Sequence, residues 1–331
     1  MRRRRSVGAY LVLPAILVGF ALTTGTLPAR EPEIPQGNGR VGVYLTSHAV
    51  NAARLMDPVL RAGAEGKINT LVINVKNMHG EVTYDSSIPL ATAIGANTAR
   101  VDLSSVLASL RAQGFYLIAR QVLFYDPLLA KYLGLETSWV PCSNQLACAY
   151  NLAIAEEVAA LGFDELQFDY IRFSDGGPLE NLYAERFAAV NAFLATAAQR
   201  LSGIITLSAD VFGRVLWKWN ERKIDPIGQS LEEMTPYLDY ISPMVYPSHY
   251  VEKTYQEDPY RVVQDAMTSG AARTETPIRP FLQAFDRLVP ESMTLETYLR
   301  EQIRAAEEHG AEGYLFWHPA CEYDTLFHVL P

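Results

Sequence analysis

Two acidic residues stand at the ends of consecutive apolar runs in the middle of the chain. Asp169 ends the run Glu-Leu-Gln-Phe-Asp, and Asp210 follows the run Ile-Ile-Thr-Leu-Ser-Ala. Two carboxyl groups that are brought close together can serve as an acid and a base or nucleophile, because their mutual repulsion separates their pKa values. We therefore take Asp169 and Asp210 as the candidate catalytic pair.

Each acid also has a purely structural alternative. Asp169 could be the ion-pair partner of Arg120 or Arg172, and Asp210 could be the buried partner of Lys76. Charged groups inside a protein are rarely left unpaired, so both alternatives remain open at this stage.

Strand-like apolar runs alternate with helical patterns from Val41 to the end of the chain. Such alternation indicates parallel strands joined by right-handed crossovers. The expected strands are Val41–Ser47, Thr70–Lys76, Phe115–Phe124, Glu165–Phe173, Ile204–Phe212, Tyr240–Tyr246, Ile278–Phe285 and Gly313–His318. The expected helices are Asn51–Glu65, Leu103–Gln113, Ala149–Leu161, Leu179–Leu201, Leu231–Tyr237, Tyr260–Ser269, Leu295–His309 and Tyr323–Val329.

Eight strand–helix units predict an α/β fold, a single closed (β/α)₈ TIM barrel. An open doubly wound sheet is the alternative, but no glycine-rich phosphate loop follows the first strand. In a barrel, alternate side chains point inward, and sites form at the carboxyl ends of the strands. We expect Asn74 with Lys76, Arg120, and Tyr314 with His318 to face the interior. Glu165 begins its strand and is expected to be solvated at the opposite end.

The first residues read as a targeting segment. Arg2 to Arg5 precede an uncharged, mostly apolar stretch, which is the layout of a secretory signal, although its length also allows an uncleaved membrane anchor. We assign residues 1–29 to this segment, 30–40 to a linker and 41–331 to the barrel. The protein is then expected to be exported, to the periplasm or the extracellular space, with the membrane contacted only through an uncleaved anchor.

Cysteine usage and charge narrow the functional classes. Export makes a disulfide between Cys142 and Cys148 a candidate, with two unpaired thiols as the alternative, and Cys321 is left over. The formal net charge of −9 argues against nucleic acid as a partner. No Cys/His spacing suggests zinc, and no dinucleotide fingerprint or nucleophile elbow occurs, so neither a metal nor a cofactor is expected.

Three longer motifs resemble a known family. They are Leu-Gly-Phe-Asp-Glu-Leu-Gln-Phe-Asp-Tyr-Ile-Arg-Phe ending at Phe173, Ser-Ala-Asp-Val-Phe-Gly ending at Gly213, and Tyr-Ile-Ser-Pro-Met-Val-Tyr-Pro-Ser-His-Tyr ending at Tyr250. These closely resemble a bacterial family of glycosyl hydrolase domains, and the likeness extends from about Val41 to about Trp317. The resemblance implies an amylase-like barrel that acts on carbohydrate.

One position departs from that family pattern. The family tends to carry an acid before the lysine of the second strand, whereas this chain has Asn74 before Val75 and Lys76. Asn74 can form hydrogen bonds but cannot act as a base, and we expect its role to be structural.

A carbohydrate substrate would need aromatic platforms and hydrogen-bonding groups around the two acids. The candidate substrate-binding residues are Lys76, Arg120, Trp217, Tyr246, His249, Gln283 and His318.

The sequence therefore predicts an exported glycosidase that acts on a polysaccharide or oligosaccharide. Asp169 would be the nucleophile or charge stabiliser, and Asp210 the partner acid or base. Their placement on neighbouring strands favours a short separation between the carboxyl groups and hence retention of anomeric configuration. The alternatives are an inactive carbohydrate-binding or cell-envelope scaffold protein and a deacetylase or lyase barrel.

Overall fold

The computed structural model describes residues 39–179 and 181–331. The predicted signal or anchor over residues 1–29 and nearly all of the linker over 30–40 lie outside the described residues. Among the helices in the described part of the chain, none is long and apolar enough to cross a membrane.

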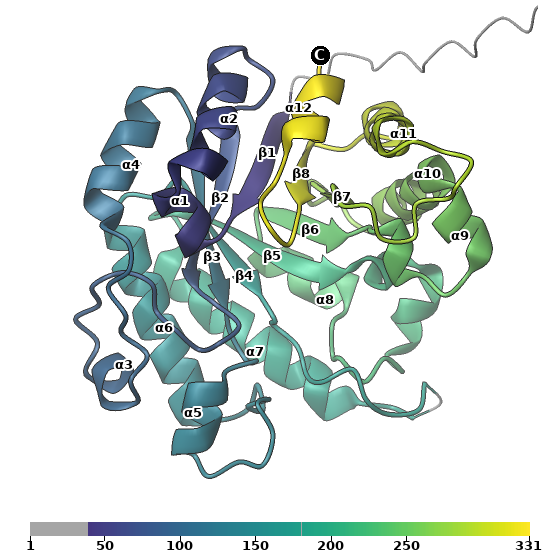
Figure 1. Cartoon of the computed structure of the whole chain (residues 1–331). Helices are drawn as coiled ribbons and strands as arrows, with labels where there is room; N and C mark the ends of the chain where they lie inside the picture. Colours follow the sequence, from purple (N-terminus) through teal and green to yellow (C-terminus); the bar gives the residue numbers. More distant parts are fainter. Residues whose placement is uncertain (1–38, 180) are drawn as a thin grey trace, which may run out of the picture. The chain divides into compact units, whose positions relative to one another are not determined.

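Eight parallel strands close into a barrel (Figure 1), with each strand paired to its sequence neighbours and β8 paired to β1. The predicted TIM barrel is therefore confirmed. The strands are β1 (Arg40–Leu45), β2 (Thr70–Lys76), β3 (Tyr116–Val122), β4 (Glu165–Asp169), β5 (Thr206–Phe212), β6 (Tyr240–Met244), β7 (Phe281–Gln283) and β8 (Gly313–Trp317).

Helices surround the barrel and bury apolar side chains against the outward faces of the strands. In α2, Leu55, Met56, Val59 and Ala62 are buried at helical spacing, which gives that helix one apolar face. The α-helices are α1 (Ser47–Asn51), α2 (Ala53–Ala64), α3 (Pro89–Ala93), α4 (Leu103–Ala112), α5 (Pro127–Tyr132), α6 (Gln145–Ala160), α7 (Ala184–Leu201), α8 (Leu231–Met234), α9 (Lys253–Glu257), α10 (Pro259–Ala271), α11 (Leu295–Glu308) and α12 (Asp324–Val329). Short 3₁₀ turns occupy Gly213–Leu216, Lys218–Arg222, Thr235–Tyr237 and Pro247–His249.

Two strands are shorter than their apolar runs suggested. β4 stops at Asp169 because Tyr170 has a φ of 51°, a left-handed conformation that cannot continue a strand. β7 covers only Phe281–Gln283, since Pro280 supplies no N–H to a strand ladder. The early end of β4 puts Asp169 at the rim of the barrel.

A shift of register in β2 corrects the expected orientation of Lys76. Asn74 pairs with Arg120, but Lys76 pairs with the next residue, Gln121, so one residue of β2 is bulged out between them. Asn74 therefore shares the inward face of Arg120, and Lys76 shares the outward face of Gln121.

The orientation expected for β8 is also wrong by one residue. Leu315 pairs with Phe281, which lines the interior, and Trp317 follows on the same face. Tyr314 lies beside Glu307 of α11 and so faces the helix layer. Because side chains alternate along a strand, this single offset exchanges the whole inward and outward sets.

Candidate active site

A pocket of about 210 Å³ lies at the carboxyl ends of the strands. Five of the predicted site residues meet there: Arg120, Asp169, Asp210, Tyr246 and His249. They come from β3, β4, β5 and the segment after β6. Sites in this architecture form at this end of the barrel, so the position matches the expectation for a reaction centre.

The two candidate acids stand side by side on adjacent strands. Phe168 pairs with Ala209, which places Asp169 and Asp210 one residue further along neighbouring strands. Both side chains are almost fully buried, with 5% and 2% of their surface exposed. These two residues alone could supply the two carboxyl groups that a hydrolytic site requires.

Arg120 bridges the two acids. One of its terminal nitrogens pairs with Oδ2 of Asp169, and its Nε lies 3.7 Å from Oδ2 of Asp210. The ion pair with Arg120 that was the structural alternative for Asp169 is therefore present. The corresponding alternative for Asp210, an ion pair with Lys76, is absent from the described residues. An ion pair with an arginine is compatible with chemistry, since it holds the carboxylate charged and fixes its orientation.

Asn74 and Tyr44 hold Arg120 in place. The Arg120 guanidinium donates to Oδ1 of Asn74 at 2.7 Å, and the Asn74 amide donates to the Tyr44 hydroxyl at 2.9 Å. The side chain at the position where the family tends to carry an acid therefore orients the arginine that bridges the two acids. This contact supports the structural role expected for Asn74.

The two acids differ in their electrostatic environment. Asp169 accepts a hydrogen bond from the Tyr170 backbone N–H at 2.5 Å in addition to its ion pair with Arg120. Burial, and then repulsion from Asp169, raises the pKa of Asp210 well above its usual range despite Arg120. Oδ1 of Asp210 has no hydrogen-bond partner among the described residues. Arg120 thus makes its closer ion pair with Asp169, and Asp210 is the member of the pair whose surroundings favour the protonated form.

The bridging cation remains charged. Burial alone would lower the pKa of Arg120, but Asp169, Tyr44 and Asp210 together raise it above its usual value. Burial also raises the pKa of Tyr44 to about 12, so its hydroxyl stays protonated.

An aromatic wall faces the two acids. Tyr246 stacks on Trp317 with ring centroids 5.9 Å apart and 27° between the planes, and His249 meets Tyr246 edge-on at 4.8 Å. Burial lowers the pKa of His249, so its imidazole is neutral near pH 7. Trp317 ends β8 and lines the pocket, although the sequence motif gave it no assigned role. Its inward orientation could not be read from β8 because the expected phase was inverted.

Trp217 belongs to a second, neighbouring pocket of about 580 Å³. Its ring stacks on Tyr255 with centroids 5.7 Å apart. Phe212, Met244 and His249 line both pockets, so the two pockets are adjacent. Trp217 is therefore placed to contact a ligand only where that ligand extends beyond the pocket of the two acids.

Lys76 does not reach the pocket. Its ammonium group is fully buried on the outside of the barrel, 2.7 Å from Asp126, and donates to the carbonyl of Val122 and to Asn151 of α6. Asp126 in turn caps α5 through the Leu129 N–H. The bulge in β2 turns Lys76 outward, which is why it does not face the pocket as expected. Lys76 instead links the loop after β3 to the helix layer.

Gln283 and His318 likewise hold loops rather than line the pocket. Gln283 accepts from the backbone N–H of Ser248 and donates to the carbonyl of Arg287. Nδ1 of His318 accepts from the backbone N–H groups of Ala320 and Glu322 in the turn after β8. Neither side chain is among the residues that line the pocket of the two acids.

The opposite end of the interior is closed by a buried ion pair. Glu165 and Arg279 pair with both side chains fully buried, and Glu165 also accepts from the Ser208 hydroxyl. Glu165 is therefore not solvated as expected. Its strand phase, which it shares with Gln167 and Asp169, was the signal that should have placed it inside.

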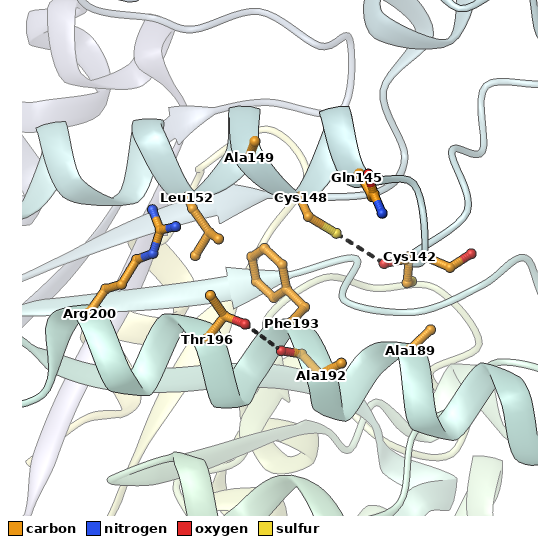
Figure 2. Close-up of a pocket in the computed structure, with 11 residues that line it drawn as sticks. Cys142, Gln145, Cys148, Ala149, Leu152, Ala189, Ala192, Phe193, Thr196 and Arg200 are labelled. Carbon is orange, nitrogen blue, oxygen red and sulfur yellow. Dashed lines mark hydrogen bonds between the residues drawn. The ribbon is translucent and has the colours of Figure 1, made fainter.

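The candidate disulfide cysteines lie on the outside of the barrel and are free thiols. Figure 2 shows the thiol of Cys148 directed at the carbonyl oxygen of Cys142, at a distance of 3.1 Å. Both line a groove of about 440 Å³ between α6 and α7, together with Phe193 and Arg200. This groove carries no carboxyl group and is not part of the candidate active site.

The described residues contain no group of three or more His, Cys, Asp or Glu side chains arranged to hold a metal ion.

The barrel is similar to several solved structures of carbohydrate-active proteins. The Bacillus cereus spore cortex-lytic enzyme SleL is 12% identical over 89% of this chain and 75% of its own, with a TM-score of 0.57. The endo-1,4-beta-D-mannanase of Thermotoga petrophila RKU-1 is 12% identical over 84% of this chain and 88% of its own, with a TM-score of 0.57. The Rhizomucor miehei endo-1,4-beta-mannanase is 10% identical over 91% of this chain and 97% of its own, with a TM-score of 0.60. At such identities the likeness shows the fold alone.

Family membership rests on the sequence match itself. No curated protein matches the chain. A family model described as "Putative glycosyl hydrolase domain" matches residues 42–323, which span all eight strands except the first residues of β1. The protein is thus a member of that glycosyl hydrolase domain family.

Proposed function

We propose that this barrel hydrolyses a glycosidic bond, with Asp210 as the general acid and Asp169 as the nucleophile or base. The observation that carries the proposal is the contrast between the two neighbouring carboxyl groups. Asp169 is paired with Arg120, whereas burial and repulsion from Asp169 raise the pKa of Asp210 well above its usual range. One acid with a proton to give and one without is the arrangement that glycoside hydrolysis requires.

The remaining groups of the pocket support this division of roles. Arg120 fixes the Asp169 carboxylate, and Asn74 fixes Arg120. Tyr246 and Trp317 offer stacked aromatic faces against which the apolar face of a sugar ring can pack. When Asp210 gives its proton to the leaving oxygen, the nearby Nε of Arg120 is placed to stabilise the carboxylate that forms.

The test is hydrolysis of a panel of polysaccharides by the wild type, Asp169→Asn and Asp210→Asn, followed by the release of reducing ends. Mannan, chitin and bacterial spore cortex belong in the panel, since the structural neighbours act on such materials. We expect each substitution to lower the rate by roughly 10²–10⁴-fold. Asp164→Asn is the control, because Asp164 pairs with Arg111 at the opposite end of β4. Equal rates in all four proteins would contradict the assignment.

A binding protein without turnover is the competing function, and one observation favours it. The ion pair with Arg120 occupies an oxygen of Asp169 that a nucleophile would need free. Under this alternative, the wild type binds a glycan, Asp169→Asn still binds it, and no reducing ends appear. Release of reducing ends by the wild type would dispose of it.

We also keep two expectations from the sequence as proposals. Residues 1–29 are proposed to direct export, which sequencing the N-terminus of the protein from fractionated cells would test, because cleavage near Ala29 would remove the segment. Retention is proposed from the adjacent placement of Asp169 and Asp210. The anomer formed first in the hydrolysis, observed by NMR, would decide it.

A further inference from the structure

Arg172 is a buried cation in the wall of the candidate active-site pocket. It follows β4 by three residues and has 8% of its surface exposed. Its guanidinium lies over the rings of Trp139, Tyr170 and Phe212, at 4.5, 5.1 and 4.4 Å from their centroids. Aromatic faces on several sides hold this group in one orientation.

Arg172 differs from the other arginines near the site because no carboxylate among the described residues pairs with it. Arg120 pairs with Asp169 and Asp210, and Arg214 pairs with Asp175 and Asp225. The Arg172 side chain instead donates a hydrogen bond to the carbonyl of Phe173 at 3.1 Å. Burial is the main cause that lowers the pKa of Arg172. Attraction to Asp169 and Asp175 opposes this effect, although neither carboxylate lies within ion-pair distance of Arg172.

The charges that line the pocket do not balance. Two guanidinium groups, those of Arg120 and Arg172, and two carboxyl groups, those of Asp169 and Asp210, line the pocket, and burial raises the pKa of Asp210 well above its usual range. This shift favours an excess of positive charge in the pocket, inside a chain whose formal net charge is −9. Arg172 and the two acids line the same pocket of about 210 Å³, so a ligand in that pocket lies near Arg172.

The geometry points to an acidic glycan as the substrate: Arg172 binds an anionic substituent, a carboxylate or a phosphate or sulfate ester, on the sugar that occupies the pocket. A planar guanidinium presents paired N–H donors that match the oxygens of such groups. The anion would neutralise the excess positive charge and provide the partner that Arg172 lacks. This inference rests on the proposed function, because it identifies the substrate class of that same pocket.

The experiment measures equilibrium binding by calorimetry of full-length wild type and Arg172→Gln. The ligands are glucose, glucuronic acid, glucose 6-phosphate and glucose 6-sulfate, so that carboxylate and ester anions are separated. Arg186→Gln is the matched control. Arg186 also lies over two rings, those of Phe173 and Tyr183, and donates to a backbone carbonyl, that of Pro226, but it is not among the residues that line the pocket.

We expect the wild type to bind at least one acidic sugar about tenfold or more tightly than glucose, since hydrogen bonds to charged groups are the stronger ones. Arg172→Gln should abolish that preference, whereas Arg186→Gln should keep it. The acidic sugar with the largest preference identifies the anion. Thermal unfolding of each variant checks that it is folded.

Three results would overturn the inference. They are equal affinity of the wild type for glucose and all acidic sugars, no detectable binding of any acidic sugar, and a preference that survives in folded Arg172→Gln. Binding is measured without turnover, so failure here is distinct from failure of the proposed hydrolysis. A wild type that prefers acidic sugars but cleaves no glycan keeps this inference and rejects hydrolysis. A wild type that cleaves glycans but gives any of the three results above keeps the proposed hydrolysis and rejects this inference.

Discussion

Replacing Asp210 by asparagine should make the stability of the protein less sensitive to pH. In the folded protein, burial and Asp169 raise the pKa of Asp210 well above its usual range, whereas in the unfolded chain the same group titrates near its ordinary value of about 4. Between these two pKa values the folded protein holds a proton that the unfolded chain has released. An asparagine side chain has nearly the same shape but no such proton to lose, so this linkage disappears in the variant.

The sign and the size of the change in unfolding free energy with pH follow from this difference in bound protons between the folded and the unfolded protein. The favourable contribution of protonated Asp210 is complete below about pH 4 and is lost as the pH rises toward the folded pKa. The wild type should lose up to about 1.4 kcal/mol of unfolding free energy relative to Asp210→Asn for each unit of pH within this window. The slope is the diagnostic quantity, because a constant offset between the two proteins could come from packing alone.

Urea unfolding of both proteins at intervals from about pH 4 to pH 8 measures the slope. Asp57→Asn, which removes an exposed carboxyl group on α2, is the control for the loss of one aspartate. The wild-type hydrolysis rate should also fall at the upper end of the same window, as the acid loses its proton. A stability difference between wild type and Asp210→Asn that is independent of pH would refute the reasoning, because Asp210 would then not be held protonated by the fold.

Further substitutions test the roles of Lys76, which lies outside the pocket, and of Trp317 and Trp217, which line the two pockets. Lys76→Met should lower the unfolding free energy by about 3–5 kcal/mol, since it leaves Asp126 buried and unpaired. The double variant with Asp126→Leu should recover part of this loss. A loss of activity per folded molecule with unchanged stability would instead indicate that Lys76 acts in the active site. Trp317→Ala should raise KM by roughly tenfold with little change in kcat, because it removes a face that binds the sugar in both the ground and transition states. Trp217→Ala should raise KM only for longer oligosaccharides, and an equal effect on the shortest substrate would contradict its place in the neighbouring pocket.

Local sequence patterns were sufficient to predict much of the fold. Runs such as Thr70–Lys76 alternate with helical periodicity, and repeated strand–helix units can close only in the order in which they occur. That order alone puts Asp169 and Asp210 on neighbouring strands. The candidate acids were therefore predictable from apolar runs and chain order, without any knowledge of side-chain contacts.

The tertiary structure decided which way the other polar side chains point. A bulge in β2 turns Lys76 away from the pocket, and the pairing of β8 with β7 puts Trp317 rather than His318 on the inward face. Strand alternation has a period of two, so a slip of one residue reverses every inward and outward assignment that follows. The sequence of a single strand does not reveal such a slip, because it is set by pairing with the neighbouring strands.

The tertiary structure also determined which charged side chains form ion pairs with one another. Arg172 and Asp169 are three residues apart, and a direct ion pair between them was a reasonable expectation from the sequence. The left-handed turn at Tyr170 ends β4 at Asp169, Asp169 pairs with Arg120 of the neighbouring strand β3, and Arg172 lies among aromatic rings from three separate segments. Whether a charge is paired or free depends on which side chains meet it in space, and those meetings exist only after the strands have closed into a barrel.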